Sequence, residues 1–201
     1  MFVVDDDASV RKGLARLVKA AGYEAETFAS VRDFLARRQH DGPCCLVLDV
    51  RMPGLTGLDL QDALRSAGQR LSIVFITGYR DVPVSVKAMK GGAVDFLTKP
   101  VDEGTLLGAI RQAVARTLAD RRQQARVAEI RSRIATLTLR EAAVFALVVT
   151  GMLNKQIGAE LGIAEKTVKV HRARVMEKMR AGSLAELVRL SAEASVITAG
   201  P

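Results

Sequence analysis

The sequence predicts an α/β doubly wound domain with a five-stranded parallel sheet, joined by a long helical linker to an all-α four-helix domain. Three observations predict this architecture. Apolar runs alternate five times with helical patterns over about the first 115 residues, which is typical of a parallel sheet covered by helices. From Glu103 to about Arg133 the chain contains no proline, as expected of one long helix. Beyond it, apolar residues recur at helical spacing in four further stretches.

The five strands are predicted from short apolar runs bounded by turn residues. The run from Cys44 to Leu48 ends on Asp49, and a Pro-Gly turn follows soon after. A run of this kind is typical of a strand that is buried on both faces of a parallel sheet. We predict strands at residues 2–4, 24–28, 44–48, 72–77 and 94–97.

The helices of the first domain are predicted from apolar spacing and from residues that begin or end helices. Ser9 is predicted to cap the first helix and Gly22 to end it. Asp102 is predicted to cap the last helix of the domain. Between these two, helices are predicted at residues 30–38, 58–67 and about 83–90.

Composition argues against a membrane protein. The 201 residues are 49% hydrophobic, but no apolar run approaches the roughly 18 residues that a membrane span needs. The chain also does not begin with a secretory pattern. Cys44 and Cys45 are adjacent in a predicted strand, where neighbouring side chains point to opposite faces, so a disulfide between them is not expected. We therefore predict buried, reduced thiols in a cytoplasmic protein without a membrane partner.

The charge is concentrated in the second half of the chain. The net charge is +8, and residues 117–201 carry 14 Lys and Arg against 8 Asp and Glu. Six of these basic residues fall between Ala164 and Arg180, on one predicted helix. A basic excess on one helix indicates a polyanionic partner, although a merely solvated basic face gives the same charge count.

Polar residues follow the predicted strands at the points where the strands end. Asp5 and Asp6 follow the first strand, Asp49 the third, Thr77 ends the fourth, and Lys99 follows the fifth. The carboxyl ends of parallel strands meet at one edge of the sheet, where ligands bind. Oxygen ligands suit Mg²⁺, a carboxylate can accept a phosphoryl group, and lysine and threonine can hold phosphoryl oxygens. The sequence thus predicts a phosphoryl-accepting site that uses a divalent cation.

These residues lie in motifs that resemble a known domain family. The pattern Asp5-Asp6, Asp49 with Met52-Pro53-Gly54, Thr77-Gly78 and Lys99-Pro100 resembles the receiver domain of bacterial two-component response regulators. The resemblance covers residues 2 to about 118. It implies a flavodoxin-like fold and a sensor histidine kinase as partner.

The resemblance also implies a role for each motif residue. Asp49 would be the phosphoacceptor, and Thr77 and Lys99 would bind the phosphoryl group. Phe96 would be the aromatic residue that changes rotamer on activation. The cofactor would be Mg²⁺ or Mn²⁺, held by Asp5, Asp6, Asp49 and the backbone carbonyl of Arg51.

Two further positions are implied to control how long the phosphate survives. In receiver domains, the residues two beyond the phosphoacceptor and two beyond the threonine flank the path of the hydrolytic water. These residues are Arg51 and Tyr79 here, and relatives often carry Gly-His-Gly-Asp where this chain has residues 78–81. We hypothesise that Tyr79 partly screens the acyl phosphate.

The linker is predicted as a continuation of the last helix of the first domain. Its apolar residues Val127, Ile130, Ile134 and Leu137 recur at spacings of three, four and three. This stripe either pairs with a partner chain or docks on the following domain, and the sequence leaves both alternatives open. We predict domain boundaries at residues 1–118, 119–136 for the linker, and 137–201.

The second domain has the outline of a DNA-reading helix-turn-helix. Thr138 and Glu141 form a capping box, and Asn154 is predicted to cap the next helix. Gly162 is predicted to end that helix before the basic one. We predict helices from Thr138 to Gly151 and at residues 155–161, 164–179 and about 183–191. Two helices joined by a short glycine-containing turn, with the second one basic, are typical of this motif.

Sequence motifs in this half are more specific than its outline. The segments 137–141, 154–157, 161–163 and 167–172 resemble the LuxR-type effector domain, over about residues 134–195. The resemblance implies that Lys169 and Val170 read bases, and His171 is predicted to be packed and hydrogen-bonded on the inner face. The further predicted DNA contacts are Lys155, Lys166, Thr167, Arg172, Arg174 and Lys178, mostly to phosphates.

The combined prediction is a phosphorylation-dependent transcription regulator rather than an enzyme. A histidine kinase would phosphorylate Asp49, and the chain would then dimerise and bind promoter DNA, with RNA polymerase as a further candidate partner. A phosphatase with an aspartyl nucleophile is the main alternative, but such enzymes usually need a second acid where this chain has Arg51. A regulator that ignores phosphate is a third alternative, although it would be expected to lack an acid or Lys99.

Overall fold

The computed structural model describes all residues except 39, 41, 70, 80 and 196–201. The chain divides into two compact units, Met1–Arg121 and Arg122–Pro201, and each is described by itself below. The boundary between them falls inside one long helix. No helix in the described part of the chain combines the length and the apolar character that crossing a membrane requires.

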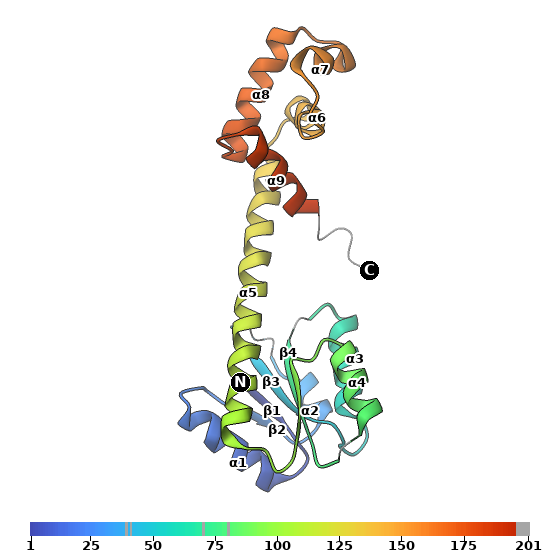
Figure 1. Cartoon of the computed structure of the whole chain (residues 1–201), viewed down its shortest axis with the longest axis vertical. Helices are drawn as coiled ribbons and strands as arrows, with labels where there is room; N and C mark the ends of the chain where they lie inside the picture. Colours follow the sequence, from blue (N-terminus) through green and yellow to red (C-terminus); the bar gives the residue numbers. More distant parts are fainter. Residues whose placement is uncertain (39, 41, 70, 80, 196–201) are drawn as a thin grey trace. The chain divides into compact units, whose positions relative to one another are not determined.

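The first unit is built on a five-stranded sheet in which all neighbouring strands are parallel (Figure 1). The strand order is β2-β1-β3-β4-β5. The strands are β1 (Phe2–Val4), β2 (Glu26–Phe28), β3 (Cys45–Asp49), β4 (Ser72–Thr77) and β5 (Asp95–Thr98). The predicted doubly wound fold is therefore confirmed. The third strand lies one residue later than predicted, so Asp49 is its last residue.

Helices cover both faces of this sheet (Figure 1). One face packs against α1 (Ala8–Ala20) and the first part of α5 (Glu103–Ala135). The other packs against α2 (Val31–Leu35), α3 (Gly57–Ser66) and α4 (Val82–Lys90). Cys44 and Cys45 belong to the cores on opposite faces, and both thiols are free, as predicted.

Two details of the helix ends in the first unit differ from the prediction. The cap of α1 is Asp7 rather than Ser9, because the Asp7 carboxylate accepts hydrogen bonds from the backbone N–H groups of Ser9 and Val10, at 2.7 and 3.2 Å. Ser9 already lies inside the helix, so its hydroxyl is past the position from which a cap acts. Helix α2 ends at Leu35, three residues earlier than predicted. The predicted cap at Asp102 is confirmed by a 2.8 Å bond from the Thr105 N–H.

Helix α5 belongs to both units. In the first unit, Leu106, Ile110 and Ala113 are buried against the sheet. In the second unit, Ile130 joins the apolar core that the following helices form, and Val127 is also buried. The linker stripe therefore docks on its own following domain, which was the second of the two alternatives.

The second unit is all-α, as predicted. After α5 it contains α6 (Leu139–Val148), α7 (Asn154–Leu161), α8 (Glu165–Met179) and α9 (Leu184–Ser195). Their buried side chains form one core, with Val144, Ile157, Val168, Met179 and Leu187 among its fully buried members. The capping box at the start of α6 is confirmed, with the Thr138 N–H donating to Glu141 and the Glu141 N–H to the Thr138 hydroxyl.

The predicted cap of α7 is wrong. Leu153 precedes the helix, and its backbone N–H donates to the Gln156 side chain at 2.8 Å. Asn154 is the first residue of the helix, and its side-chain oxygen instead accepts a hydrogen bond from Arg172 on α8 at 3.1 Å. Gly162 ends the helix in the left-handed conformation, with φ of 65°, as predicted from a glycine at this place.

Candidate functional site

The carboxyl edge of the sheet brings three of the predicted site residues into direct contact. The Lys99 ammonium lies 2.7 Å from Asp5 Oδ2 and 2.7 Å from Asp49 Oδ1. The other Asp49 oxygen accepts a 2.7 Å hydrogen bond from the Arg51 N–H. Asp5 is almost completely buried and Asp49 is 6% exposed. Three strands, β1, β3 and β5, thus contribute to one charged cluster.

The backbone around Asp49 is held by close packing of the segment that follows it. The Val50 N–H donates to Ile76 on β4, and the Gly57 N–H donates back to the Val50 carbonyl at 3.0 Å. A Cβ atom on Gly57 would lie 2.3 Å from the Asp49 carbonyl oxygen, which is closer than packed atoms approach. Glycine at the first position of α3 therefore allows the helix to start directly against the acidic residue. Sequence reasoning missed this role.

The pKa values of Asp49 and Lys99 follow from their burial and from the hydrogen bonds that the Lys99 ammonium donates to Asp5 and Asp49. Burial raises the pKa of the Asp49 carboxyl, and the hydrogen bond from Lys99 offsets this only in part. Burial also acts to lower the pKa of Lys99, but hydrogen bonds to Asp49 and Asp5 outweigh it, and the pKa of Lys99 is raised. Lys99 therefore stays a cation, and it balances one of two neighbouring carboxylates when both are ionised.

The donor atoms fit a magnesium ion in their chemistry. Asp5, Asp49 and the Arg51 carbonyl supply hard oxygen atoms near one buried edge, the kind of ligand that Mg²⁺ prefers. Asp6 is exposed beside Asp5 and adds a third carboxylate on the solvent side. Among the residues that the structure describes, no three acidic, histidine or cysteine side chains already form a cation-binding group.

Thr77 and Phe96 lie on the neighbouring strands β4 and β5. Thr77 is 3% exposed, and its hydroxyl accepts a 3.3 Å hydrogen bond from the Tyr79 N–H. Its carbonyl accepts a 2.7 Å bond from the Lys99 N–H, which fixes the start of the lysine side chain. Phe96 is half-buried and packs against Phe75 on β4, with ring centroids 6.1 Å apart.

A second cation near the charged cluster is the partly exposed side chain of Arg51. The Arg51 guanidinium lies 3.3 Å from an Asp81 carboxylate oxygen and stacks over the Tyr79 ring, 4.7 Å from its centroid. The contact joins the β3–α3 loop to the β4–α4 loop. Arg51 and Tyr79, the two residues expected to flank the path of the hydrolytic water, thus contact each other. Asp81 is a further partner of Arg51, which the sequence did not indicate.

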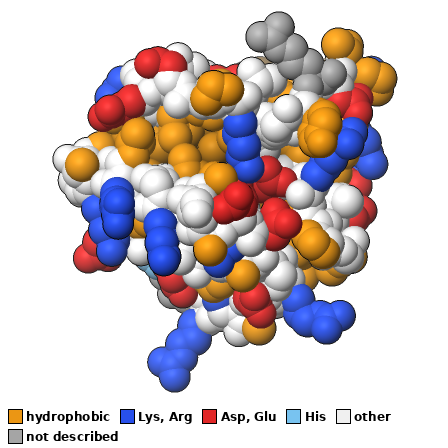
Figure 2. Space-filling model, turned by 90° about the horizontal axis from the view of Figure 1, so that it is seen from below, with side chains coloured by type: hydrophobic (Ala, Val, Ile, Leu, Met, Phe, Trp, Pro, Cys, Tyr) orange, Lys and Arg blue, Asp and Glu red, His pale blue; other side chains and the backbone are white. Residues whose placement is uncertain are grey.

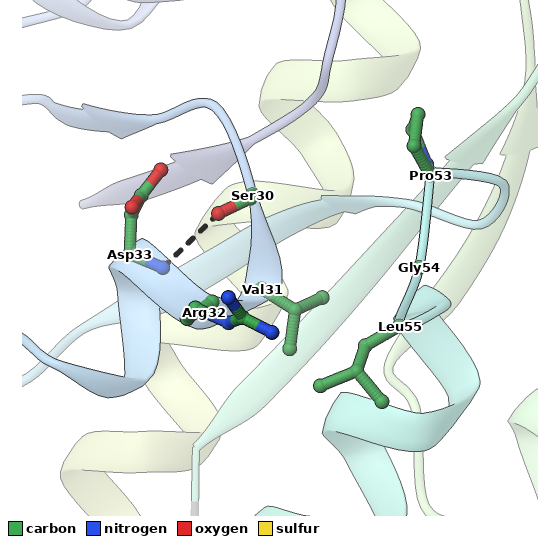
Figure 3. A pocket seen from close by; sticks show the side chains of 7 residues that line it. All are labelled: Ser30, Val31, Arg32, Asp33, Pro53, Gly54 and Leu55. Carbon is green, nitrogen blue, oxygen red and sulfur yellow. Dashed lines mark hydrogen bonds between the residues drawn. The ribbon is translucent and has the colours of Figure 1, made fainter.

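Charged and apolar side chains lie close together on one face of the molecule (Figure 2). Figure 2 shows acidic side chains gathered near the centre of one face, with basic side chains and an apolar hollow close by. A cavity of about 700 Å³ lies between the start of α2 and the β3–α3 loop. Figure 3 shows Val31 and Leu55 pointing toward one another across it, and the Ser30 hydroxyl accepting the Asp33 N–H. None of the predicted site residues lines this cavity.

The second unit presents one polar face of α8 to solvent. Val168, Val175 and Met179 are buried, whereas Val170 is 46% exposed. The predicted contact residues that are exposed are Lys155 on α7 and Lys166, Thr167, Lys169, Val170 and Arg174 on α8. A buried glycine, Gly158, allows the turn between α7 and α8 to pack closely on α7, because an added Cβ would lie 2.8 Å from the Ile163 carbonyl oxygen. The unit therefore has the helix-turn-helix geometry with a basic second helix.

Comparisons with known proteins assign the family. Residues 1–111 match the response regulator receiver domain, and residues 135–191 match the bacterial regulatory proteins of the luxR family. Nodulation protein W of Bradyrhizobium diazoefficiens is 50% identical over 95% of this chain and 84% of its own length. The transcriptional regulatory protein FixJ of Azorhizobium caulinodans is 42% identical over 99% and 94%. The solved structure of response regulator StyR is 46% identical, with coverage of 96% and 97% and a TM-score of 0.83.

This chain belongs to the response regulators with a LuxR-type effector domain. The family predicted from the motifs is thus confirmed. Its first unit contains the receiver domain, and its second unit contains the LuxR-type domain. Of the relatives named above, FixJ is by name a transcriptional regulatory protein.

Three predicted DNA contacts of the LuxR-type domain already have partners inside the domain. Lys169 lies 3.1 Å from Glu165 one turn earlier, and Arg172 donates to Asn154. The Lys178 ammonium donates to Glu141 at 2.6 Å and to the Thr136 carbonyl at 2.9 Å. The pairs at Lys169 and Arg172 are exposed or partly exposed, whereas the Glu141 carboxylate is almost fully buried.

The pair of Lys178 and Glu141 links α8 to the start of α6. Glu141 is 2% exposed, and its pKa is lowered to about 2 by the hydrogen bond from Lys178 and by the one from the Thr138 N–H. The carboxylate is thus held ionised inside the LuxR-type domain. Sequence reasoning found the capping box but missed this ion pair, because its partners are 37 residues apart.

His171 of the LuxR-type domain is partly buried on α8, but its Nδ1 atom does not make the predicted hydrogen bond to any residue that the structure describes. The side chain is half-buried on α8, between the exposed face and the core. Its buried Nδ1 atom has no hydrogen-bond partner within the described part of the chain. His171 thus lies between the exposed Val170 and the buried Val168 and Val175 along α8.

Proposed function

We propose that this response regulator accepts a phosphoryl group on Asp49 from a sensor histidine kinase, then dimerises and binds promoter DNA. The contact of Lys99 with both Asp5 and Asp49 carries the proposal, because it joins a buried nucleophilic carboxylate to a fixed cation. We assign the receiver function to residues 1–118, the linker to 119–136 and DNA binding to 137–201. The name of the relative FixJ, a transcriptional regulatory protein, supports a role in the regulation of transcription.

In the proposed transfer, an Asp49 carboxylate oxygen forms a bond to phosphorus. The bond between phosphorus and the phosphohistidine nitrogen of the kinase breaks, and that nitrogen takes up a proton. Lys99 moves from Asp49 to the new phosphoryl oxygens, which carry more charge than the carboxylate oxygen they replace. The Thr77 hydroxyl then donates to a second phosphoryl oxygen, and this leaves space that the Phe96 ring can enter.

Magnesium is the cofactor that we propose for this step. Asp5, Asp6, Asp49 and the Arg51 carbonyl would hold it, with water in the remaining positions. The ion supplies positive charge beside the phosphoryl oxygens during transfer. Manganese offers similar coordination and is the alternative ion.

Pairing of two chains would follow from the change around Phe96. Helix α4 begins just after the Thr77 loop and carries three exposed apolar side chains, Val82, Val86 and Met89. Apolar area of this kind favours association. A dimer would place two LuxR-type domains on two half-sites, which raises affinity because the second contact becomes intramolecular.

DNA reading is assigned to the exposed face of α8. Lys169 and Val170 are proposed to contact bases, since lysine donates to guanine acceptors and an apolar side chain touches the thymine methyl group. The proposed phosphate contacts are Lys155, Lys166, Thr167, Arg172 and Arg174. We assign Lys178 to stabilising the domain instead, because its ammonium is engaged with Glu141. RNA polymerase is the further partner that an activator would need.

The proposal is tested by measuring DNA affinity and molecular mass with and without a small phosphodonor and Mg²⁺. We expect the donor to convert the unaltered chain to a dimer and to tighten its binding to promoter DNA by about tenfold or more. Asp49→Ala should stay monomeric and should bind equally with and without the donor. Donor-independent binding by both proteins would refute phosphorylation as the switch.

Glu165 provides a test of the DNA-reading face. Its carboxylate pairs with Lys169 and lies on the exposed side of α8 that would face the DNA. Glu165→Gln should therefore tighten binding to DNA of any sequence by about threefold or more at low salt, because one repulsive charge is removed and Lys169 is released. Glu177→Gln, an exposed glutamate near the other end of α8, is the matched control and should change affinity less. Equal effects of the two substitutions would contradict this placement of the DNA.

A further inference from the structure

Asp81 uses its two carboxylate oxygens for two different contacts. One oxygen accepts a 3.2 Å hydrogen bond from the Val84 N–H, which caps α4. The other lies 3.3 Å from the Arg51 guanidinium. One side chain therefore joins the first turn of α4 to the loop that follows the phosphoacceptor.

The Arg51 side chain lies within reach of two anionic groups, the Asp81 carboxylate and a phosphoryl group on Asp49. Its backbone N–H donates directly to Asp49 at 2.7 Å, so its side chain starts beside the carboxylate that would carry the phosphoryl group. Its guanidinium is instead directed to Asp81 and lies over the Tyr79 ring. Both side chains of the ion pair are partly exposed, and ion pairs of this kind are weak.

A phosphoryl group would be the stronger partner for this guanidinium. It carries close to two negative charges and three acceptor oxygens, and arginine can bind such oxygens in pairs. Phosphorylation at Asp49 therefore favours release of Asp81 and movement of Arg51 toward the phosphoryl oxygens. In that position Arg51 would also fill part of the path by which water reaches phosphorus.

We propose that Asp81 is a positioning residue that competes with the phosphoryl group for Arg51, and thereby shortens the lifetime of the acyl phosphate. The same exchange frees one Asp81 oxygen at the start of α4 whenever Asp49 is phosphorylated. The inference rests on the proposed phosphorylation of Asp49 and adds to it a residue that regulates the phosphate.

The reaction that Asp81 influences is hydrolysis of the acyl phosphate. A water oxygen forms a bond to phosphorus, and the bond between phosphorus and the Asp49 oxygen breaks. The products are the Asp49 carboxylate, inorganic phosphate and one proton. Arg51 held on the phosphoryl group hinders the approach of water, and Arg51 held on Asp81 does not.

Asp81→Asn separates the two contacts of this residue. Asparagine caps helices as well as aspartate does, so α4 keeps its start, but the charge that attracts Arg51 is lost. After phosphorylation with acetyl phosphate and Mg²⁺ and removal of the donor, the phosphate on Asp81→Asn should last about twofold to fivefold longer than on the unaltered chain, the range that a weak ion pair allows. Asp81→Ser, which also keeps a capping side chain, should behave in the same way.

Dependence on Arg51 distinguishes positioning from a general structural effect. Arg51→Ala should shorten the lifetime, and Asp81→Asn should have no further effect in the Arg51→Ala background. Thermal unfolding of Asp81→Asn should match that of the unaltered chain. An unchanged lifetime in Asp81→Asn, or an equal lengthening with and without Arg51, would overturn the inference while the proposed function stands. If acetyl phosphate labels the unaltered chain no more than Asp49→Ala, the proposed function and this inference both fall.

Discussion

Gly57→Ala is expected to lower the unfolding temperature of the receiver domain by about 10 °C, which corresponds to about 3 kcal/mol. The added Cβ would lie 2.3 Å from the Asp49 carbonyl oxygen and 3.1 Å from side-chain atoms of Leu48 and Phe75. The nearest of these atoms belongs to backbone in a central strand, which has little freedom to move. Calorimetry or far-UV circular dichroism on the whole chain measures the effect, and phosphorylation of Asp49 should slow as well.

Gly13→Ala is the matched control for this substitution. Gly13 lies inside α1, and apart from its chain neighbours and the nearby backbone of α1 no atom lies within 4 Å of a Cβ added there. Alanine is favoured over glycine inside helices by about 0.5–1 kcal/mol, so this variant should unfold at a slightly higher temperature. If Gly57→Ala and Gly13→Ala shifted the unfolding temperature in the same direction, the close contact at Asp49 would not be limiting.

Lys178→Met is the second substitution with a large expected effect, and it acts on the LuxR-type domain. Methionine preserves most of the length of the side chain but removes the ammonium from the buried Glu141 carboxylate. Leaving a buried charge without its partner is strongly destabilising. We expect the LuxR-type domain to unfold at least about 5 °C lower at neutral pH. Lys166→Met, at an exposed position on the same helix, should leave the unfolding temperature nearly unchanged.

The pH dependence of this effect has a defined direction. The pKa of Glu141 is lowered from 4.5 to about 2, and Lys178 is the largest cause. A lowered folded-state pKa stabilises the domain above pH 4.5, and this stabilisation is lost as the pH falls toward 2. The difference between Lys178→Met and the unaltered chain should therefore shrink between these two pH values. A difference that is the same at pH 7 and at pH 2.5 would show that the ion pair is not its source.

The fold could be predicted because its signals are local and periodic. The buried runs around Val3, Val47 and Val74 mark strands without help from distant residues, and the capping box of Thr138 and Glu141 marks the start of α6. Asp7 was missed as a cap because three consecutive aspartates offer the same chemistry, and only the backbone geometry selects one of them. The early end of α2 at Leu35 has no signal in the residues themselves.

The candidate site was predictable in part, for a related reason. Asp5, Asp49 and Lys99 each end or follow a strand, and parallel strands bring their ends together, so the cluster follows from topology. The contacts of Arg51 with Asp81 and of Lys178 with Glu141 depend on how loops and helix ends approach one another. No spacing in the sequence records these approaches, since the partners are 30 and 37 residues apart.

The course of α5 determines how the two domains can be separated. A fragment that starts at residue 137, the predicted boundary of the second domain, would omit Ile130, which is buried in the core of that domain. It would also omit Arg126 and Arg133, whose side chains bond to Glu193 and to the Met179 carbonyl. The smallest fragment that keeps the whole core of the LuxR-type domain therefore includes the second part of α5. To obtain this fragment, the chain must be cut or started near residue 121, within a continuous helix.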